Sequence, residues 1–128
     1  MHVVHLLRIG ISKRKVSGLL DYEIIEKEEI LVIRFYGSIG AENAQKLKKA
    51  FQTLPEENHK LVINLGVSFI TSEAIGYLIQ IYKKYREKKG EVILCNVSGN
   101  VRTVLEMIRL NKVITILESE EKALERLS

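Results

Sequence analysis

Hydrophobic and polar positions follow two different periods along this chain after its first twenty residues. Short runs that are almost continuously apolar are typical of buried strands, and apolar residues three and four positions apart are typical of amphipathic helices. The runs predict strands at residues 23–27, 30–36, 61–65, 91–95 and 113–117. The stripes predict helices over residues 44–54, 74–85 and 101–108, and a short helix after residue 119. The resulting order is β-β-α-β-α-β-α-β-α.

This order predicts an α/β fold with a mixed, partly parallel β-sheet and about four helices. Only Lys27, Glu28 and Glu29 separate the first two strands, which are therefore expected to form a hairpin. Helices separate the later strands, which implies right-handed crossovers and parallel pairing. The strand runs LVINL and EVILC are apolar on both sides, so we expect helices to cover much of both faces of the sheet.

Residues that start or stop helices support these boundaries. Pro55 is expected to end the first helix, because the residue before a proline avoids the helical conformation. Gly90 is expected to end the longest helix in the left-handed conformation, and the third helix is expected to end near Asn111. Ser119 can cap the last helix, and the acidic residues after it suit the positive end of the helix dipole.

The length and the charge distribution predict one domain and no nucleic-acid partner. A chain of 128 residues with 46% hydrophobic residues can fill one core without disulfides or metal. The net charge of +4 comes entirely from residues 1–20, which carry Arg8, Lys13, Arg14 and Lys15 and no acid. We therefore predict a basic N-terminal extension over 1–20 and one domain over 21–128, whose neutral charge does not attract phosphate backbones. The sequence leaves open whether the extension is an edge strand or a mobile arm.

Cysteine and apolar-run content predict a soluble, cytoplasmic protein. Cys95 is the single cysteine and lies in an apolar run, so an inert buried thiol in a reducing compartment is expected. No apolar run approaches the roughly 18 residues that span a bilayer, and the N-terminus lacks a signal-peptide pattern. We therefore expect no membrane partner.

Several kinds of chemistry are missing from the sequence. Asp21 is the only aspartate, so a magnesium-holding cluster of aspartates cannot form, and no glycine-rich phosphate loop is present. The histidines His2, His5 and His59 lack metal-ligand spacing. None of them lies in a segment expected to reach Ser72 as a catalytic base. We therefore expect no enzyme activity, no metal and no cofactor.

Three stretches carry a family resemblance: FYGSIGAENA, SFITSEAIG and GEVILCNVSGNVRTVLEMIRLNKV. With them, residues 22–127 resemble the STAS domains of the anti-sigma factor antagonist family, small bacterial regulators that bind a kinase-type anti-sigma factor. The resemblance implies a STAS-type sheet and a non-enzymatic role in transcription signalling. In that family the unmodified antagonist captures the kinase and frees the sigma factor, and phosphorylation by the kinase prevents this. ATP and magnesium would belong to the kinase.

The same resemblance implies a site. The family serine that is phosphorylated aligns with Ser72, but Thr71 replaces the aspartate before it and Glu73 stands at a small-residue position. Gly40 stands where antagonists commonly carry an aspartate that faces the partner. The implied phosphorylation site is Ser72, and the implied partner-binding residues are Ser38, Gly40, Glu42, Thr71, Ser72, Glu73, Ile75 and Gly76.

The residues leave several interpretations open. Thr71, Ser72 and Glu73 are also ordinary helix-start residues, so Ser72 is either a helix cap or a phosphorylation switch. The whole domain is either an antagonist or a STAS scaffold whose switch has decayed. A third alternative is a small-molecule or nucleotide binder, because open α/β sheets bind ligands near strand ends. The expected oligomeric state is a monomer or a weak homodimer.

Overall fold

The computed structural model describes residues 20–128, which form one five-stranded sheet with the strand order β1-β2-β3-β4-β5. The strands are β1 Leu20–Lys27, β2 Ile30–Gly37, β3 Lys60–Val67, β4 Glu91–Cys95 and β5 Thr115–Leu117. β1 and β2 pair antiparallel, and every later neighbour is parallel. The predicted element order and the mixed, mostly parallel sheet are therefore confirmed. The predictions for the N-terminal extension lie outside the described residues, except that Leu20 already belongs to β1.

The hairpin between β1 and β2 turns on two residues with positive φ, Glu28 at 50° and Glu29 at 73°. Two central residues in the left-handed region give the turn whose twist matches that of the strands on either side. The register pairs Lys27 with Ile30 and Leu20 with Gly37. The first residue of β1 therefore lies beside the last residue of β2, at the carboxyl end of β2.

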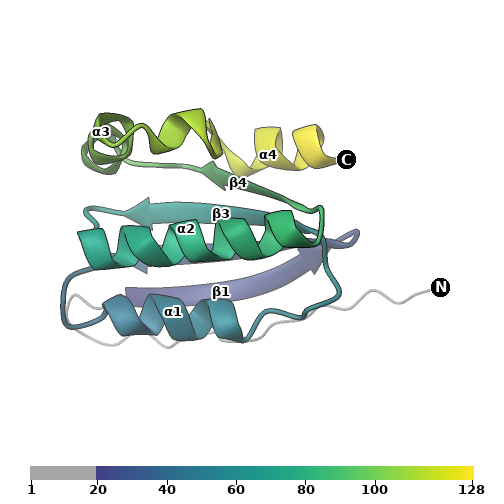
Figure 1. Cartoon of the computed structure of the whole chain (residues 1–128), viewed down its shortest axis with the longest axis horizontal. Helices are drawn as coiled ribbons and strands as arrows, with labels where there is room; N and C mark the ends of the chain where they lie inside the picture. The colour runs from purple at the N-terminus through teal and green to yellow at the C-terminus, as the bar shows by residue number, and fades with distance from the viewer. Residues whose placement is uncertain (1–19) are drawn as a thin grey trace.

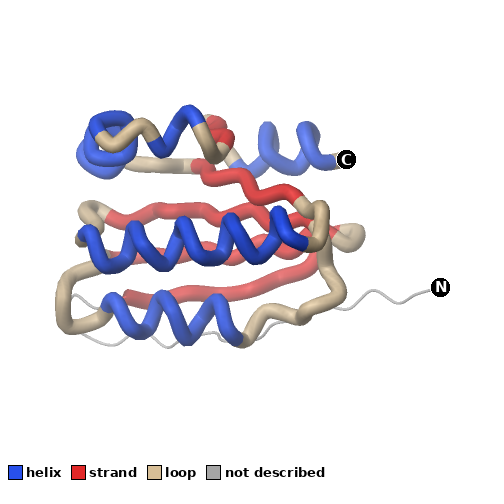
Figure 2. Tube along the Cα trace, viewed as in Figure 1, coloured by secondary structure: helices blue, strands red, loops and turns tan. Residues whose placement is uncertain are grey.

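Helices cover both faces of the sheet, as the apolar strand runs predicted. The α-helices in residues 20–128 are α1 Ala44–Gln52, α2 Ser72–Glu87, α3 Gly99–Met107 and α4 Glu120–Leu127, and a short 3-10 helix, η1, spans Leu110–Lys112. α1 and α2 lie side by side on one face (Figure 1), and with α3 they enclose the larger core. α4 packs on the other face over β3, β4 and β5 and closes a smaller core around Val32, Val62 and Ile93 (Figure 2).

The prediction that Gly90 ends α2 in the left-handed conformation is wrong. The residue in the left-handed conformation is Lys89, with φ 61°, and not Gly90. A Cβ at position 90 would clash with the backbone carbonyl of His59, and the Gly90 N–H donates to the Tyr85 carbonyl at 2.7 Å. The glycine is needed because two backbone segments approach closely there, and not because of its own dihedral angles.

Two further boundaries differ from the sequence pattern. α1 ends at Gln52, before the proline, because Thr53 closes the last turn by donating its hydroxyl to the Ala50 carbonyl at 2.7 Å. β5 begins at Thr115 instead of residue 113, since Val113 follows the 3-10 turn and is 54% exposed. Val113 has the apolar character of a strand residue but lies outside the sheet.

The last helix is tied to the sheet by a polar network on the second face. Ser119 caps α4 as predicted, accepting from Lys122 N at 3.2 Å. The next residue, Glu120, accepts hydrogen bonds from Arg34 Nε at 2.6 Å and from Asn64 Nδ2 at 2.9 Å. Burial alone would raise the pKa of the Glu120 carboxyl, but the bonds from Arg34 and Asn64 hold that pKa below its usual value.

None of the helices in residues 20–128 is long and apolar enough to cross a bilayer.

Candidate functional site

The loops that follow β2 and β3 meet at one edge of the sheet, the left end in Figure 1. Because the two strands are parallel, the loops that follow them both leave the sheet at the carboxyl ends of the strands. The loops are joined by backbone hydrogen bonds from Ile39 N to Phe69 O at 3.1 Å and from Ser68 N to Gly37 O at 2.9 Å. Two of the sequence stretches singled out for the site are therefore in direct contact.

Thr71, and not Ser72, caps the helix that starts at this edge. Thr71 has extended backbone angles, and its hydroxyl accepts from Ala74 N at 3.3 Å. Ser72 is the first residue of α2 and is exposed, and no group in the described part of the chain bonds its hydroxyl. The capping role proposed for Ser72 belongs to its neighbour, which leaves the Ser72 hydroxyl accessible to another protein.

The carboxylate of Glu73 is held away from the end of the helix by two polar side chains. Tyr77 donates its hydroxyl to Glu73 Oε2 at 2.8 Å, and this hydrogen bond raises the pKa of the tyrosine. Gln45 of α1 donates its amide to Tyr77 Oη at 2.9 Å and, more weakly, to Glu73 Oε2 at 3.4 Å. Glu73 therefore joins α1 to α2 immediately beside Ser72.

The loop between β2 and α1 is shaped by Asn43. This side chain, only 8% exposed, accepts from Gly40 N at 2.8 Å and donates to the Ser38 carbonyl at 3.0 Å. Gly40 does not have a positive φ, and a Cβ there would first meet the flexible carboxylate of Glu42, at 3.1 Å. The loop is thus compact for reasons that do not require glycine at position 40.

No feature of the described residues suggests a metal or a reactive nucleophile. Within residues 20–128 no three histidine, cysteine, aspartate or glutamate side chains are grouped closely enough to hold a metal ion. Burial raises the pKa of the Cys95 thiol to about 12, so that thiol is protonated at neutral pH. The predicted burial of the cysteine is confirmed.

The STAS domain family model matches residues 21–123. This chain belongs to the STAS domain family. The match begins just after the basic N-terminal residues and covers every strand and helix described above except Leu20 at the start of β1 and the end of α4. The family resemblance seen in the three sequence stretches is therefore confirmed.

Relatives of this STAS domain span the same length of chain. It is 24% identical over 111 residues to the anti-sigma F factor antagonist of Paenibacillus polymyxa, covering 84% of this chain and 95% of the relative. A solved anti-sigma factor antagonist from Mycobacterium paratuberculosis has a TM-score of 0.78 at 19% identity, covering 88% of this chain and 97% of that one. The phosphorylated form of the Bacillus cell fate determinant SpoIIAA has a TM-score of 0.65 at 21% identity, and the match covers 84% of this chain and 99% of that one. At such identities the structures show a shared fold.

The residues implied as partner contacts occupy different environments in this STAS domain. Glu42, Ser72 and Glu73 are exposed, and Gly76 has open space where a side chain would begin. Ile75 is only 6% exposed and packs in the larger core, so its side chain is not on the surface. The remaining three, Ser38, Gly40 and Thr71, lie within the two joined loops and are half-buried or buried.

Two residues that the sequence analysis did not include in the site help to form it. Phe69 is 49% exposed beside the start of α2. Asn43 organises the loop before α1, and its signal in the sequence was a polar, turn-forming residue just before a helix. Phe69 gives the site an apolar surface group that the charged residues lack.

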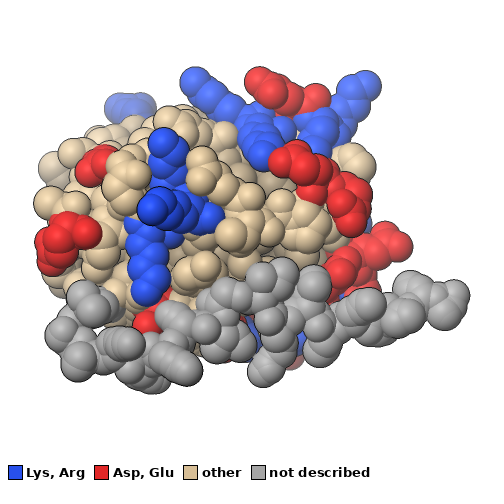
Figure 3. All heavy atoms as spheres, turned by 90° about the horizontal axis from the view of Figure 1, so that it is seen from below, with Lys and Arg blue, Asp and Glu red and all other residues tan. Residues whose placement is uncertain are grey.

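On the face that Figure 3 draws, charged side chains are distributed differently at the two ends of the STAS domain. Figure 3 keeps the left and right ends of Figure 1 and shows basic and acidic side chains crowded together at the right-hand end. Acidic side chains are scattered at the left-hand end, where the candidate site lies, and a column of basic side chains lies between that end and the centre. Two of the exposed residues of that site, Glu42 and Glu73, are acidic. A phosphate at Ser72 would therefore join existing negative charge.

Proposed function

We propose that this STAS domain is an anti-sigma factor antagonist, a non-enzymatic protein that binds a serine-kinase anti-sigma factor and is controlled by phosphorylation at Ser72. The observation that carries the proposal is the exposed hydroxyl of Ser72 on the first turn of α2, left free because Thr71 provides the cap. Relatives that align along nearly their whole length are named as anti-sigma factor antagonists. One solved relative is described in a phosphorylated form.

The proposed docking surface combines an apolar group with small and polar ones. Phe69 can pack into a pocket of the partner, since half-exposed aromatic side chains are frequent anchors of protein interfaces. Ser72 lies three positions further along the chain, and Gly76 leaves room for close approach one turn later. The joined loop after β2 contributes Glu42 at the side.

Phosphorylation at this position would change binding while leaving the fold intact. A phosphate adds about −1.5 to −2 charge, and the positive end of the helix dipole tolerates it. The Ser72 hydroxyl takes part in no hydrogen bond of the described fold, so the modification breaks none. A partner surface that covers the unmodified hydroxyl would then face a desolvated charge beside Glu42 and Glu73 and would be expelled.

The glutamate beside Ser72 is compatible with this switch. In the family pattern a small residue follows the phosphorylated serine, and here Glu73 replaces it. The bonds to Tyr77 and Gln45 draw the Glu73 carboxylate along the helix and toward α1. Thr71, which replaces the family aspartate, still performs the capping that an aspartate would provide. These contacts favour a working switch over a decayed one.

The decisive experiment compares capture of partners by the wild type and by Ser72→Asp in the lysate of the source organism. A matched control is Lys83→Gln, which lowers the net charge by one at an exposed position of α2 that does not line a pocket. The proposal expects a protein with a serine-kinase domain to bind the wild type and the control but not Ser72→Asp. Incubation of that kinase with ATP should phosphorylate the wild type at Ser72 and leave Ser72→Ala unmodified. Equal capture by all three proteins, with no phosphate at Ser72, would instead support a constitutive STAS scaffold.

A further inference from the structure

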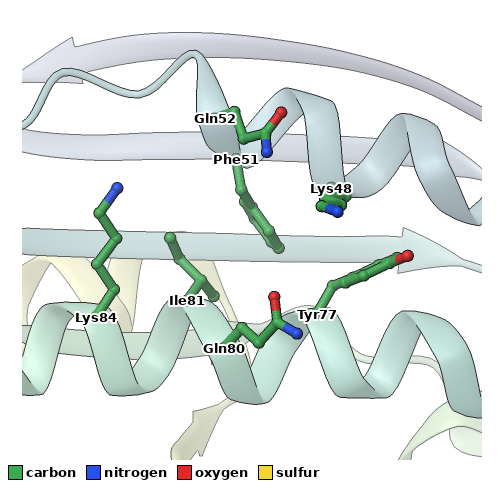
Figure 4. Close-up of a pocket in the computed structure, with 7 residues that line it drawn as sticks. All are labelled: Lys48, Phe51, Gln52, Tyr77, Gln80, Ile81 and Lys84. Atoms are coloured by element: carbon green, nitrogen blue, oxygen red, sulfur yellow. The ribbon is translucent and has the colours of Figure 1, made fainter.

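A groove between α1 and α2 is lined by none of the residues implied as partner contacts. It encloses about 200 Å³. Figure 4 shows the side chains that line it, which come from the last turns of α1 and the middle of α2. They are Lys48, Phe51, Gln52, Tyr77, Gln80, Ile81 and Lys84.

The floor of the groove is apolar and fixed in place. Phe51 points from α1 toward α2, and Ile81 faces it from the opposite helix (Figure 4). The Phe51 ring packs edge-on against Phe35 of β2, with 5.8 Å between the ring centroids, so the sheet holds its position. Tyr77 lies at one end of the groove, and its hydroxyl is held by the bonds to Glu73 and Gln45. Phe51 and Ile81 are only 6% and 5% exposed, so a flat apolar group would lie on the edges that they expose to the groove.

The rim of the groove is polar and carries one uncompensated positive charge. Lys84 is paired with Glu56 at 2.9 Å, but no carboxylate in the described chain forms an ion pair with Lys48. The Lys48 Nζ lies 5.7 Å from the centroid of the Tyr77 ring, over the opening. The amides of Gln52 and Gln80 extend from the two helices on either side (Figure 4). These groups offer three hydrogen-bond donors to an anion.

We propose that this groove is a binding site for a small aromatic carboxylate. The ring would lie over the exposed edges of Phe51 and Ile81 and beside Tyr77, and the carboxylate would accept hydrogen bonds from Lys48 and the glutamine amides. Charge-assisted bonds of this kind are about twice as strong as neutral ones. Sites for drug-sized ligands enclose about 300–1,000 Å³, so the smaller volume here suits a single substituted ring better than a larger ligand.

The groove is linked to the candidate site by one hydrogen bond. A ring that contacts Tyr77 touches the residue whose hydroxyl positions Glu73, and Glu73 follows Ser72. A bound carboxylate can thereby influence the surface proposed to meet the anti-sigma factor. Binding to the groove does not depend on the antagonist function, so each can fail without the other.

The test is a titration of the isotope-labelled full chain with benzoate, followed by NMR of the backbone amides. We expect saturable shifts centred on the residues that line the groove, with a dissociation constant of about 1 mM or below. Lys48→Gln should weaken binding about tenfold, because it removes the free charge. The matched control Lys49→Gln changes the next residue of α1, which is exposed and does not line the groove, and should bind as the wild type does.

Two comparisons can overturn the proposal. Benzyl alcohol has the same ring without the carboxylate, and it should bind at least tenfold more weakly than benzoate. Equal binding of the two compounds would mean an apolar crevice with no anion site. Absence of saturation with benzoate up to about 10 mM, or equal affinity of the wild type and Lys48→Gln, would also contradict the proposal. All these variants change surface side chains, so misfolding does not confuse the outcome.

Discussion

Tyr77 donates a hydrogen bond to Glu73 across one turn of α2, with 2.8 Å between the hydroxyl and the carboxylate oxygen. The same hydroxyl accepts from Gln45 of α1, so one phenol joins two helices and fixes the charged neighbour of Ser72. The tyrosine ring also lines the groove between these helices. The proposed phosphorylation site and the proposed carboxylate site therefore share a structural element.

Replacement of Tyr77 by phenylalanine tests this relationship. Tyr77→Phe keeps the ring and removes the hydroxyl that draws Glu73 away from the helix end. Because the broken bonds lie at the surface, the free energy of unfolding should change little. The released carboxylate should slow phosphorylation of Ser72 by the partner kinase, measured as the initial rate of phosphate incorporation.

Tyr82→Phe is the matched control, since Tyr82 lies on the same helix and does not bond Glu73. It should leave the rate unchanged. A rate for Tyr77→Phe equal to that of the wild type would show that the orientation of Glu73 has no influence on the kinase.

The capping geometry predicts different effects for two adjacent alanine substitutions. Thr71→Ala removes the side chain that accepts from Ala74 N and should lower the free energy of unfolding by about 1 kcal/mol. Ser72→Ala removes an exposed hydroxyl with no bond and should change it by less than about 0.5 kcal/mol. Urea unfolding of both variants beside the wild type measures the difference. The reverse order of effects would assign the cap to Ser72 and weaken the case for an accessible phosphorylation site.

Substitution of two glycines should affect the stability of the fold to different extents. Gly40→Asp introduces the carboxylate that the family commonly carries, at a position where only the flexible end of Glu42 lies close. The domain should remain folded, losing no more than about 1 kcal/mol to repulsion between the new carboxylate and that of Glu42, and should bind the kinase partner more tightly. A melting temperature well below that of the wild type would mean that the loop needs glycine at position 40.

Gly90→Ala provides the contrast. Its Cβ would overlap the His59 backbone, with the Tyr85 carbonyl oxygen only 3.2 Å away, and neither backbone segment can move freely. Overpacking of this kind destabilises by about 1–3 kcal/mol. Thermal unfolding of Gly90→Ala should therefore begin at a clearly lower temperature, whereas an unchanged transition would show that the approach of the two backbones is adjustable.

The Glu120 network predicts a dependence of stability on pH in the acid range. The folded-state pKa of Glu120 lies below its unfolded value, which is about 4.3 for a free glutamate. The carboxylate therefore stabilises the fold above about pH 4.3, and this contribution is lost as the pH falls through the folded pKa. Glu120→Gln should flatten that part of the curve of unfolding free energy against pH.

The neighbouring Glu121 supplies the control for this measurement. It is exposed and belongs to the same first turn of α4, so Glu121→Gln should retain the acid dependence of the wild type. Identical curves for both variants would indicate that the hydrogen bonds of Arg34 and Asn64 to Glu120 do not govern the acid response.

The sequence by itself determined the order of elements and the class of sheet. The buried face of a strand or helix must carry apolar side chains. Apolar residues therefore recur about every second position in strands and every three to four positions in helices. Short caps are equally local, which is why Ser119 could be recognised as the start of α4. The three family stretches identified the STAS domain because their spacing survives at low overall identity.

The tertiary structure decided what each local signal means at the site. Periodicity does not encode which loops meet, and only the parallel pairing of β2 and β3 brings the loop after Gly37 against Phe69. The choice between Thr71 and Ser72 as the cap depends on where the backbone enters α2, and both residue types are favoured caps. The need for Gly90 arises from the distant His59 backbone, and the exposure of Phe69 from the end of the sheet beneath it. These features depend on contacts between segments far apart in the chain, and such contacts leave no period in the sequence.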